Sequence, residues 1–206
     1  MTKFILVRHG QTEWNRVERF LGRIDIPLNE TGLAQAEAVG ARLANSRIAA
    51  IFSSPLSRTM ATAEPISRRT GVAVQRLDGL IDVDFGEWQG LSPNEVAERC
   101  PNEFALWSTK PKGLRFPGGE SLEEVRLRAV STVSDLVPRY DDSTVVLVSH
   151  NVVCRVLLLG LLGLDESHFW QIGQDNAAIN AFVHDARRGF VVTLVNDTCH
   201  LELKGA

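Results

Sequence analysis

The sequence predicts an α/β fold: a three-layer α/β/α sandwich with a mostly parallel sheet and an antiparallel C-terminal hairpin. Two continuous apolar runs, residues 4–7 and 144–148, are typical of strands buried on both faces of a parallel sheet. Stretches with apolar residues at helical spacing lie between these runs and would cover the faces of the sheet. Residues 179–183 and 190–195 are β-like runs joined by a short polar segment, which predicts the hairpin.

The first part of the chain alternates predicted strands and helices. After the strand at residues 4–7, a polar loop spans residues 16–28. Thr31 is the expected N-cap of a helix, because apolar residues follow it at helical spacing as far as Leu43. Residues 49–52 form the second predicted strand.

A second helix is predicted from Ser54 and Pro55, a capping residue followed by proline at the first helical position. Arg58 would then lie about one turn into this helix, near N-terminal N–H groups that favour anions. Pro65 is expected to kink or end the helix, and residues 72–74 form a short third strand.

The middle of the chain predicts loops and two more helices. Residues 78–90 are acidic and contain glycine, which indicates a loop, and Ser92 begins a helix that runs toward Cys100. Residues 104–119 mix lysine, proline and glycine and predict a surface excursion near the site. Ser121 begins a capping box, so a long helix is expected after it.

The last part of the chain predicts one helix and the hairpin. Asn151 is expected to cap a helix over residues 152–161, directly after the strand at 144–148. Residues 185–189 would form the hairpin turn. The hairpin offers an edge through which two copies could pair, so a homodimer stays open at this point.

Length and composition indicate one globular domain over residues 1–206. A net charge of -3 gives no electrostatic footprint for nucleic acid or for an anionic membrane. The three cysteines lack a Cys-x-x-Cys pair, which favours free thiols in a reducing compartment. The chain starts without a signal-peptide pattern and its longest apolar run is too short to span a bilayer, so we expect a cytoplasmic protein.

Two histidines follow the two buried strands at equivalent places. Arg8 and His9 come at the end of the first strand, just before Gly10, and Ser149 and His150 end the strand at 144–148. The carboxyl ends of strands are where open α/β sheets bind ligands. The sequence therefore predicts a site at this edge of the sheet.

The ordered set of motifs resembles the histidine phosphatase superfamily, the phosphoglycerate-mutase-like group. It comprises Leu6-Val7-Arg8-His9-Gly10 with Thr12 and Asn15, the segment from Ser53 to Ala63 around Arg58, and Val148-Ser149-His150. The matched motifs run from Ile5 to Leu201, nearly the whole chain. The resemblance implies catalytic roles for Arg8, His9, Arg58 and His150, and a phosphate contact for Asn15.

The chemistry of these residues agrees with what the resemblance implies. Neutral His9 can attack phosphorus, and the guanidiniums of Arg8 and Arg58 can bind phosphate oxygens by paired hydrogen bonds, with a further bond from His150. Arginines beside His9 would also lower its pKa and keep it neutral. A metal site at the two histidines is disfavoured because their partners are cations. We therefore expect no metal and no cofactor.

The general acid is less directly indicated. Relatives in the family commonly carry a glutamate where this chain has Asp82, whose side chain is shorter by about 1.5 Å of reach. Burial near a phosphate dianion could raise its pKa enough for it to donate a proton. Asp84 and Glu87 are the alternatives, and Asp82 could instead only orient an arginine.

Several residues are candidates for contacts with the rest of the substrate. We assign substrate binding to Asn15, Gln11, Arg19, Gly22 and Asn151. A carboxylate on the substrate would need a further cation, for which Arg19, Arg23, Lys110, Lys112 and Arg115 are available. A pocket lined by Phe20, Phe85, Trp107 and Phe116 would instead favour bulky or aromatic phosphate esters.

The leading interpretation is a metal-independent phosphomonoesterase that hydrolyses a small-molecule phosphate ester through a phosphohistidine on His9. The tail resembles broad-range, phosphoserine and α-ribazole phosphatases of the family. A cofactor-dependent phosphoglycerate mutase is the alternative, but the chain is short between Phe104 and Pro117, where mutases add a segment. A third hypothesis is a phosphate-ester-binding module without turnover, for which the aspartate at position 82 is the only support.

Overall fold

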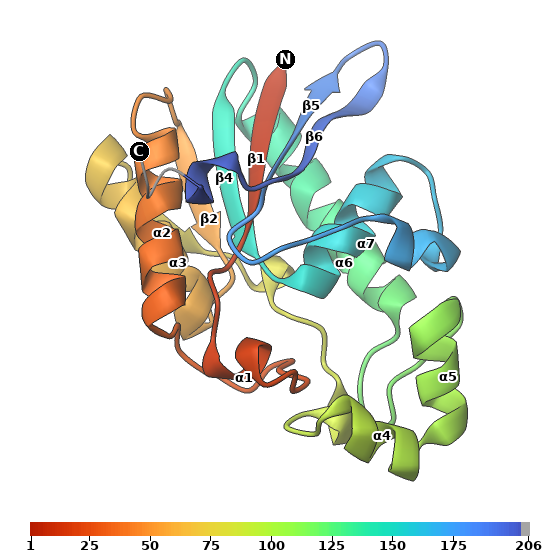
Figure 1. Ribbon diagram of the computed structural model, residues 1–206. Coiled ribbons are helices and arrows are strands. Elements are labelled where there is room, and N and C mark those ends of the chain that lie inside the picture. Colours follow the sequence, from red (N-terminus) through yellow and green to blue (C-terminus); the bar gives the residue numbers. More distant parts are fainter. Residues whose placement is uncertain (203–206) are drawn as a thin grey trace.

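The fold is built around one six-stranded sheet (Figure 1). The computed structural model describes residues 1–202, so the last four residues of the predicted domain 1–206 lie outside the described part. The strands are β1 (Thr2–Arg8), β2 (Ala50–Ser53), β3 (Val74–Arg76), β4 (Thr144–Ser149), β5 (Ile179–Asp185) and β6 (Gly189–Asp197). Their order is β3-β2-β4-β1-β5-β6.

The predicted mixture of parallel and antiparallel strands is confirmed. Strands β3, β2, β4 and β1 pair in parallel, whereas β5 is antiparallel to β1 and β6 is antiparallel to β5. The parallel register places Arg8 of β1 beside Ser149 of β4, and Ser53 of β2 beside Val148 of β4. Three strands therefore end at the same edge of the sheet.

The helices form two layers around the sheet and a cap at one end. They are α1 (Glu13–Arg16), α2 (Glu30–Leu43), α3 (Ser57–Thr70), α4 (Pro93–Arg99), α5 (Pro101–Thr109), α6 (Leu122–Leu136) and α7 (Asn151–Leu161). Figure 1 shows α2 and α3 on one face of the sheet, α6 and α7 on the other, and α1, α4 and α5 beyond the carboxyl end of β1. None of the helices in residues 1–202 combines the length and apolar character needed to cross a membrane.

Alternation along the strands divides the core into two clusters. Phe4 and Leu6 of β1 belong to the cluster beneath α6 and α7, whereas Ile5 and Val7 belong to the cluster beneath α2 and α3. Because successive strand residues point to opposite faces, a continuous apolar run can serve both helical layers. The central strand is thereby fixed from both sides.

Three predicted helix starts differ from the structure. Asn29, and not Thr31, caps α2, since its side chain accepts a hydrogen bond from the Gly32 N–H. Helix α3 begins at Ser57 after Leu56, which makes no side-chain cap, and it continues through Pro65 to Thr70. The N-cap of α7 is His150, so Asn151 is the first helical residue and not its cap.

The excursion predicted at residues 104–119 is partly helical. Helix α5 covers Pro101–Thr109, and its Trp107 packs into an aromatic cluster with Trp88 and Phe116. The helix start predicted at Ser92 and the capping box predicted at Ser121 are both present, and they begin α4 and α6; Ser92 also forms a capping box. Helix α5 therefore covers the site with an aromatic residue that belongs to the core.

Candidate active site

The carboxyl ends of β1 and β4 bring the two predicted histidines together. His9 directly follows β1, His150 directly follows β4, and their ring centroids are 5.2 Å apart. Both side chains are buried. This closeness follows from the parallel register, because neighbouring parallel strands deliver their last residues to the same edge.

One ring nitrogen of His9 is committed to the backbone. Its Nδ1 lies 2.6 Å from the carbonyl oxygen of Gly10, and because a carbonyl can only accept, Nδ1 carries the proton. Burial, assisted by the charges of Arg58 and Arg8, holds the pKa of His9 well below its usual value. The imidazole is therefore neutral at pH 7, with a free lone pair on Nε2.

Arg8 is oriented by a carbonyl from a distant loop. Its Nη1 donates to the Gln174 carbonyl at 2.5 Å, and the side chain of Gln174 exchanges two hydrogen bonds with Asn180 of β5 at 2.7 and 3.0 Å. Burial lowers the pKa of Arg8 to about 10, so the guanidinium still carries its charge at neutral pH. Its Nε is buried and lacks a hydrogen-bond partner among the described residues.

Arg58 faces the segment that follows α1. Its Nη2 donates to the carbonyl of Gly22 at 2.7 Å and lies 3.1 Å from Oδ2 of Asp82, and its Nη1 donates to the carbonyl of Ile24 at 2.9 Å. The side chain is fully buried, and burial lowers its pKa. As in Arg8, the Nε has no partner within residues 1–202.

His150 contacts Ser54, the residue that directly follows β2. Its Nε2 lies 2.7 Å from Oγ of Ser54, and its Nδ1 lies 3.5 Å from Oδ2 of Asp82 without a hydrogen bond. Burial, followed by the charge of Arg58, lowers the pKa of His150 well below its ordinary value. If Ser54 donates its hydroxyl proton to Nε2, the neutral ring keeps its own proton on Nδ1.

Asp82 is the carboxyl group nearest to these residues. The Ser149 hydroxyl at the end of β4 donates to the Leu80 carbonyl at 2.8 Å and so ties the segment that carries Asp82 to the strand end. Asp82 is 6% exposed, and burial raises its pKa against the opposing effect of Arg58. Asp84 bonds the Gly86 N–H and Glu87 is exposed, so neither shares this position.

A cavity of about 170 Å³ lies at these strand ends, and Arg8, His9, Asp82, Asn15 and Asn151 line it, whereas Arg58 and His150 do not. Its other lining residues are Arg19, Phe20, Leu21, Phe85, Trp107, Val152 and Trp170. The cavity thus combines groups suited to a phosphate with a largely apolar surround.

Some predicted binding residues lie elsewhere. Gln11 and Gly22 do not line the cavity, since Gln11 accepts a hydrogen bond from Asn29 at 2.9 Å and the Gly22 carbonyl accepts from Arg58. Gly22 instead makes a turn, with φ of 55°.

Three of the five cations predicted to bind a substrate carboxylate form ion pairs with acidic side chains of the protein. Arg23 pairs with Glu120, Lys112 with Asp165, and Arg115 with Glu124. Of the five cations predicted as carboxylate partners, Arg19 alone lines the cavity, and it already donates to the Gly90 carbonyl at 2.5 Å and to Glu95 at 3.2 Å. Phe116 is fully buried behind the aromatic wall.

Sequence reasoning missed three contributors to the site. Ser54 was expected only to begin a helix, yet its position directly after β2 puts it at the same strand edge as the histidines. Trp170 closes the cavity and donates from Nε1 to the Trp107 carbonyl at 2.5 Å. Gln174 orients Arg8 through its backbone, for which the sequence carries no signal.

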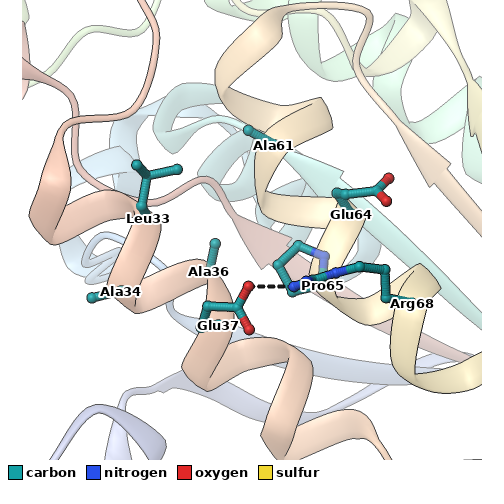
Figure 2. Close-up of a pocket in the computed structure, with 8 residues that line it drawn as sticks. All are labelled: Leu33, Ala34, Ala36, Glu37, Ala61, Glu64, Pro65 and Arg68. Carbon is teal, nitrogen blue, oxygen red and sulfur yellow. Dashed lines mark hydrogen bonds and ion pairs between the residues drawn. The ribbon is translucent and has the colours of Figure 1, made fainter.

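A second hollow, of about 480 Å³, lies between α2 and α3 (Figure 2). Ala36 and Leu33 of α2 face Ala61 and Pro65 of α3 across it, and Glu37 pairs with Arg68 at its side. None of the predicted site residues lines this hollow. This hollow is therefore separate from the site predicted from the sequence.

Several known proteins are similar to this chain in sequence. A sequence profile described as the histidine phosphatase superfamily (branch 1) matches residues 4–198. Phosphoserine phosphatase 1 of Hydrogenobacter thermophilus is 40% identical over 201 residues, which cover 98% of this chain and 95% of that protein. The metal-independent phosphoserine phosphatase of Arabidopsis thaliana is 30% identical over 208 residues, which cover 100% of this chain and 85% of that protein.

A solved structure shows the same fold with a ligand. The phosphoserine phosphatase of Entamoeba histolytica in complex with 3-phosphoglyceric acid superposes with a TM-score of 0.89 at 29% identity. The alignment covers 98% of this chain and 100% of that one.

Proposed function

Because this chain belongs to the histidine phosphatase superfamily and is a phosphatase, we propose that it hydrolyses small-molecule phosphate monoesters without a metal, through a phosphohistidine on His9. One observation carries the proposal. Three buried nitrogens have no partners among the described residues: Arg8 Nε, Arg58 Nε and His150 Nδ1. They belong to the two arginines whose charges act on His9 and to the histidine whose ring lies 5.2 Å from it. Buried donors of this kind are costly unless a ligand accepts from them, and a phosphate supplies acceptor oxygens.

The first chemical step uses the free nitrogen of His9. The lone pair of Nε2 attacks phosphorus, and the bond between phosphorus and the ester oxygen breaks. Arg8 and Arg58 stabilise the charge on the equatorial oxygens, as phosphoryl transfer requires. Asp82 gives its proton to the leaving oxygen, so that a neutral alcohol departs.

The second step releases phosphate. Water attacks the phosphorus of phosphohistidine, the nitrogen–phosphorus bond breaks, and Asp82 takes the proton from the water. His9 returns to its starting tautomer because the Gly10 carbonyl keeps the proton on Nδ1 throughout. Asp82 is then protonated again for the next cycle.

The donor set supports turnover without a metal. Two guanidiniums act on His9, and their charges attract an anion and repel a cation. The arginines supply the positive charge that a metal ion provides in other phosphatases. Metal independence also appears in the name of the Arabidopsis relative.

The cavity walls support a preference for apolar esters over phosphoserine. Phe20, Phe85, Trp107 and Trp170 line it, and the one further cation, Arg19, is already paired with Glu95. A substrate carboxylate would have to compete with Glu95 for that guanidinium. We therefore expect phenyl phosphates to have higher kcat/KM than phosphoserine, although relatives are named phosphoserine phosphatases.

The test is phosphate release in EDTA from p-nitrophenyl phosphate, phenyl phosphate, phosphoserine and 3-phosphoglycerate, for wild type and His9→Ala. Turnover should resist EDTA and vanish in the variant, and alkaline quenching should trap an acid-labile, alkali-stable phosphoenzyme only in the wild type. Turnover that survives in His9→Ala would refute the phosphohistidine route. Phosphate exchange between positions of phosphoglycerate that outpaces release would favour the mutase, and saturable binding without turnover would favour the binding module.

Compartment and assembly belong to the same proposal. Cys100, Cys154 and Cys199 are free thiols, which supports a reducing, cytoplasmic location.

Strand β6 is an edge of the sheet with Leu194 and Val195 exposed, which supports pairing of two copies there. Analytical ultracentrifugation of the wild type and of Leu194→Lys would test the pairing.

A further inference from the structure

We propose that Arg128 and Glu120 form a positioning pair that fixes the backbone on which Asp82 is carried, and thereby sets the efficiency of proton transfer to the leaving group. The inference rests on the proposed role of Asp82 as the acid. Neither residue lines the cavity, so both would act through Asp82 and not on the substrate.

Arg128 reaches from α6 to both ends of the segment that precedes and includes Asp82. Its Nη1 donates to the Gly79 carbonyl at 3.0 Å, and its Nη2 donates to the Asp82 carbonyl at 3.0 Å. A rigid guanidinium fork that holds two carbonyls three residues apart restricts the path of the backbone between them. The α6 helix thereby determines where the Asp82 main chain lies.

Glu120 holds the fork and the far side of the same segment. One carboxylate oxygen accepts from Arg128 Nε at 3.0 Å, and the other accepts from Arg128 Nη2 at 3.2 Å and from the Asp84 N–H at 2.9 Å. The Glu120 N–H in turn donates to the Asp84 carbonyl at 2.9 Å. Glu120 therefore joins the guanidinium to the residue two positions after Asp82.

The segment around Asp82 and the segment that precedes α6 meet backbone to backbone, at residues 84–86 and 117–119. A Cβ added to Gly119 would lie 2.2 Å from the Asp84 carbonyl oxygen, and one added to Gly86 would lie 2.0 Å from the Pro117 carbonyl oxygen. Such contacts admit only glycine. The close approach leaves the segment around Asp82 little freedom to shift while the positioning pair is intact.

Because the side chain of Asp82 is short, the position of its carboxyl group depends closely on the position of the backbone. An aspartate cannot compensate for a backbone shift by extending, and a misplacement of about 1 Å can reduce a catalysed rate by about 100-fold. Loss of the pair should therefore impair proton donation first. Esters with poor leaving groups depend on that proton, whereas p-nitrophenolate departs without it.

The experiment compares Arg128→Met, Arg128→Lys and Glu120→Gln with Arg126→Met as the matched control. Arg126 lies on the same helix, its side chain is also 21% exposed, and it pairs with a different acid, Glu166, at 2.6 Å. For each variant, kcat/KM, which covers only the steps up to formation of the phosphoenzyme, is measured with p-nitrophenyl phosphate and with phenyl phosphate, and the unfolding midpoint is measured in urea. We expect kcat/KM for phenyl phosphate to fall at least 10-fold in Arg128→Met, while that for p-nitrophenyl phosphate falls less than 3-fold, and we expect Arg126→Met to leave the ratio unchanged.

A double-mutant cycle separates this inference from the role of Asp82. If Arg128 acts through Asp82, Arg128→Met should add no further loss on an Asp82→Asn background. Equal losses for both esters, full additivity in the cycle, or the same ratio change in Arg126→Met would overturn the positioning role. A leaving-group effect that is missing from Asp82→Asn itself would instead refute the proposed acid. The milder Arg128→Lys, which keeps the charge and loses the fork, carries the comparison if Arg128→Met does not fold.

Discussion

The guanidinium of Arg58 lies 3.1 Å from the carboxylate of Asp82, and both side chains are buried. This contact joins the predicted phosphate-binding arginine to the predicted acid. Arg58 alone would lower the pKa of Asp82, yet burial is the larger effect and the net direction is upward. When a phosphate dianion draws the guanidinium charge to itself, the carboxyl group is favoured in its protonated form.

Replacement of Asp82 by Asn should remove the proton donor and leave the nucleophile. We expect kcat/KM, which covers the steps up to formation of the phosphoenzyme, to fall by about 100-fold or more for phenyl phosphate, with a much smaller loss for p-nitrophenyl phosphate, because general acid catalysis contributes about 10² to 10⁴. The pH dependence should differ between the two proteins. In the wild type, kcat/KM for phenyl phosphate should decline as pH rises through the raised pKa of Asp82, and this decline should be absent from Asp82→Asn. Profiles of kcat/KM against pH for both proteins check this. An equal loss for the two esters would contradict the assignment.

Removal of the Ser54 hydroxyl should impair His150. Ser54→Ala leaves Nε2 of a buried histidine without its partner at 2.7 Å, so the tautomer with a proton on Nδ1 is no longer fixed. We expect kcat/KM to fall about 10-fold, as the loss of a buried hydrogen bond typically costs about 1–3 kcal/mol. Steady-state kinetics measure the effect, and Ser57→Ala, at the half-buried start of α3, is the control. Wild-type kcat/KM in Ser54→Ala would show that the tautomer is held by other means.

Acidification should destabilise the fold through the two site histidines. Burial holds the pKa values of His9 and His150 well below 6.5 in the folded state, so below about pH 6.5 the unfolded chain binds protons that the folded chain does not. The free energy of unfolding should fall by up to about 1.4 kcal/mol per pH unit for each histidine. Asp82 opposes this at lower pH, since its raised pKa lets the folded state take up a proton first.

Urea unfolding between pH 7 and pH 5 measures that slope. His9→Gln should reduce it by about one proton, because only His150 then contributes from the site. A slope in His9→Gln equal to that of the wild type would mean that His9 is protonated in the folded protein. That result would also remove the neutral nucleophile on which the proposed chemistry depends.

Gly32→Ala should disturb the site from outside it. A Cβ at Gly32 would lie 2.0 Å from the carbonyl oxygen of Gln11, on the segment that follows His9. The backbone must move apart, at a cost of about 1–3 kcal/mol or more, and His9 should move with it. The free energy of unfolding, measured by chemical denaturation, and kcat/KM should both fall. Thr31→Ala, at the exposed neighbouring residue, should change neither by much. Unaltered kcat/KM in a destabilised Gly32→Ala would show that His9 is positioned independently of α2.

The sequence was most informative where one local rule and the fold agree. The continuous apolar runs around Phe4 and Val146 predicted the central strands, because residues of β1 and β4 are buried on both faces. Ser92 followed by proline, and the capping box at Ser121, predicted helix starts, because each signal needs at most four consecutive residues. Features that depend on a few adjacent residues can be deduced without the rest of the chain.

Prediction failed where tertiary contacts override a local rule. Ser54 looks like a helix cap, but its hydroxyl instead lies against His150, which is 96 residues away. Pro65 stays within α3, where it packs closely against Gly40 of α2. Arg58 was predicted from motif order, but no local pattern could show that its fork also binds the Gly22 and Ile24 carbonyls.

The position of β1 between β4 and β5 determines when His9, the proposed nucleophile, can take its place in the site. Both partners of this strand are encoded more than 130 residues after it, and pairing over such separations is slow. On the ribosome, β1 and His9 emerge before the segments ending at Ser149 and Asp185, so the strand stays unpaired until both segments have been synthesised. The nascent chain therefore exposes an apolar strand while more than 130 further residues are added, and phosphatase activity should appear abruptly, only once β5 is available.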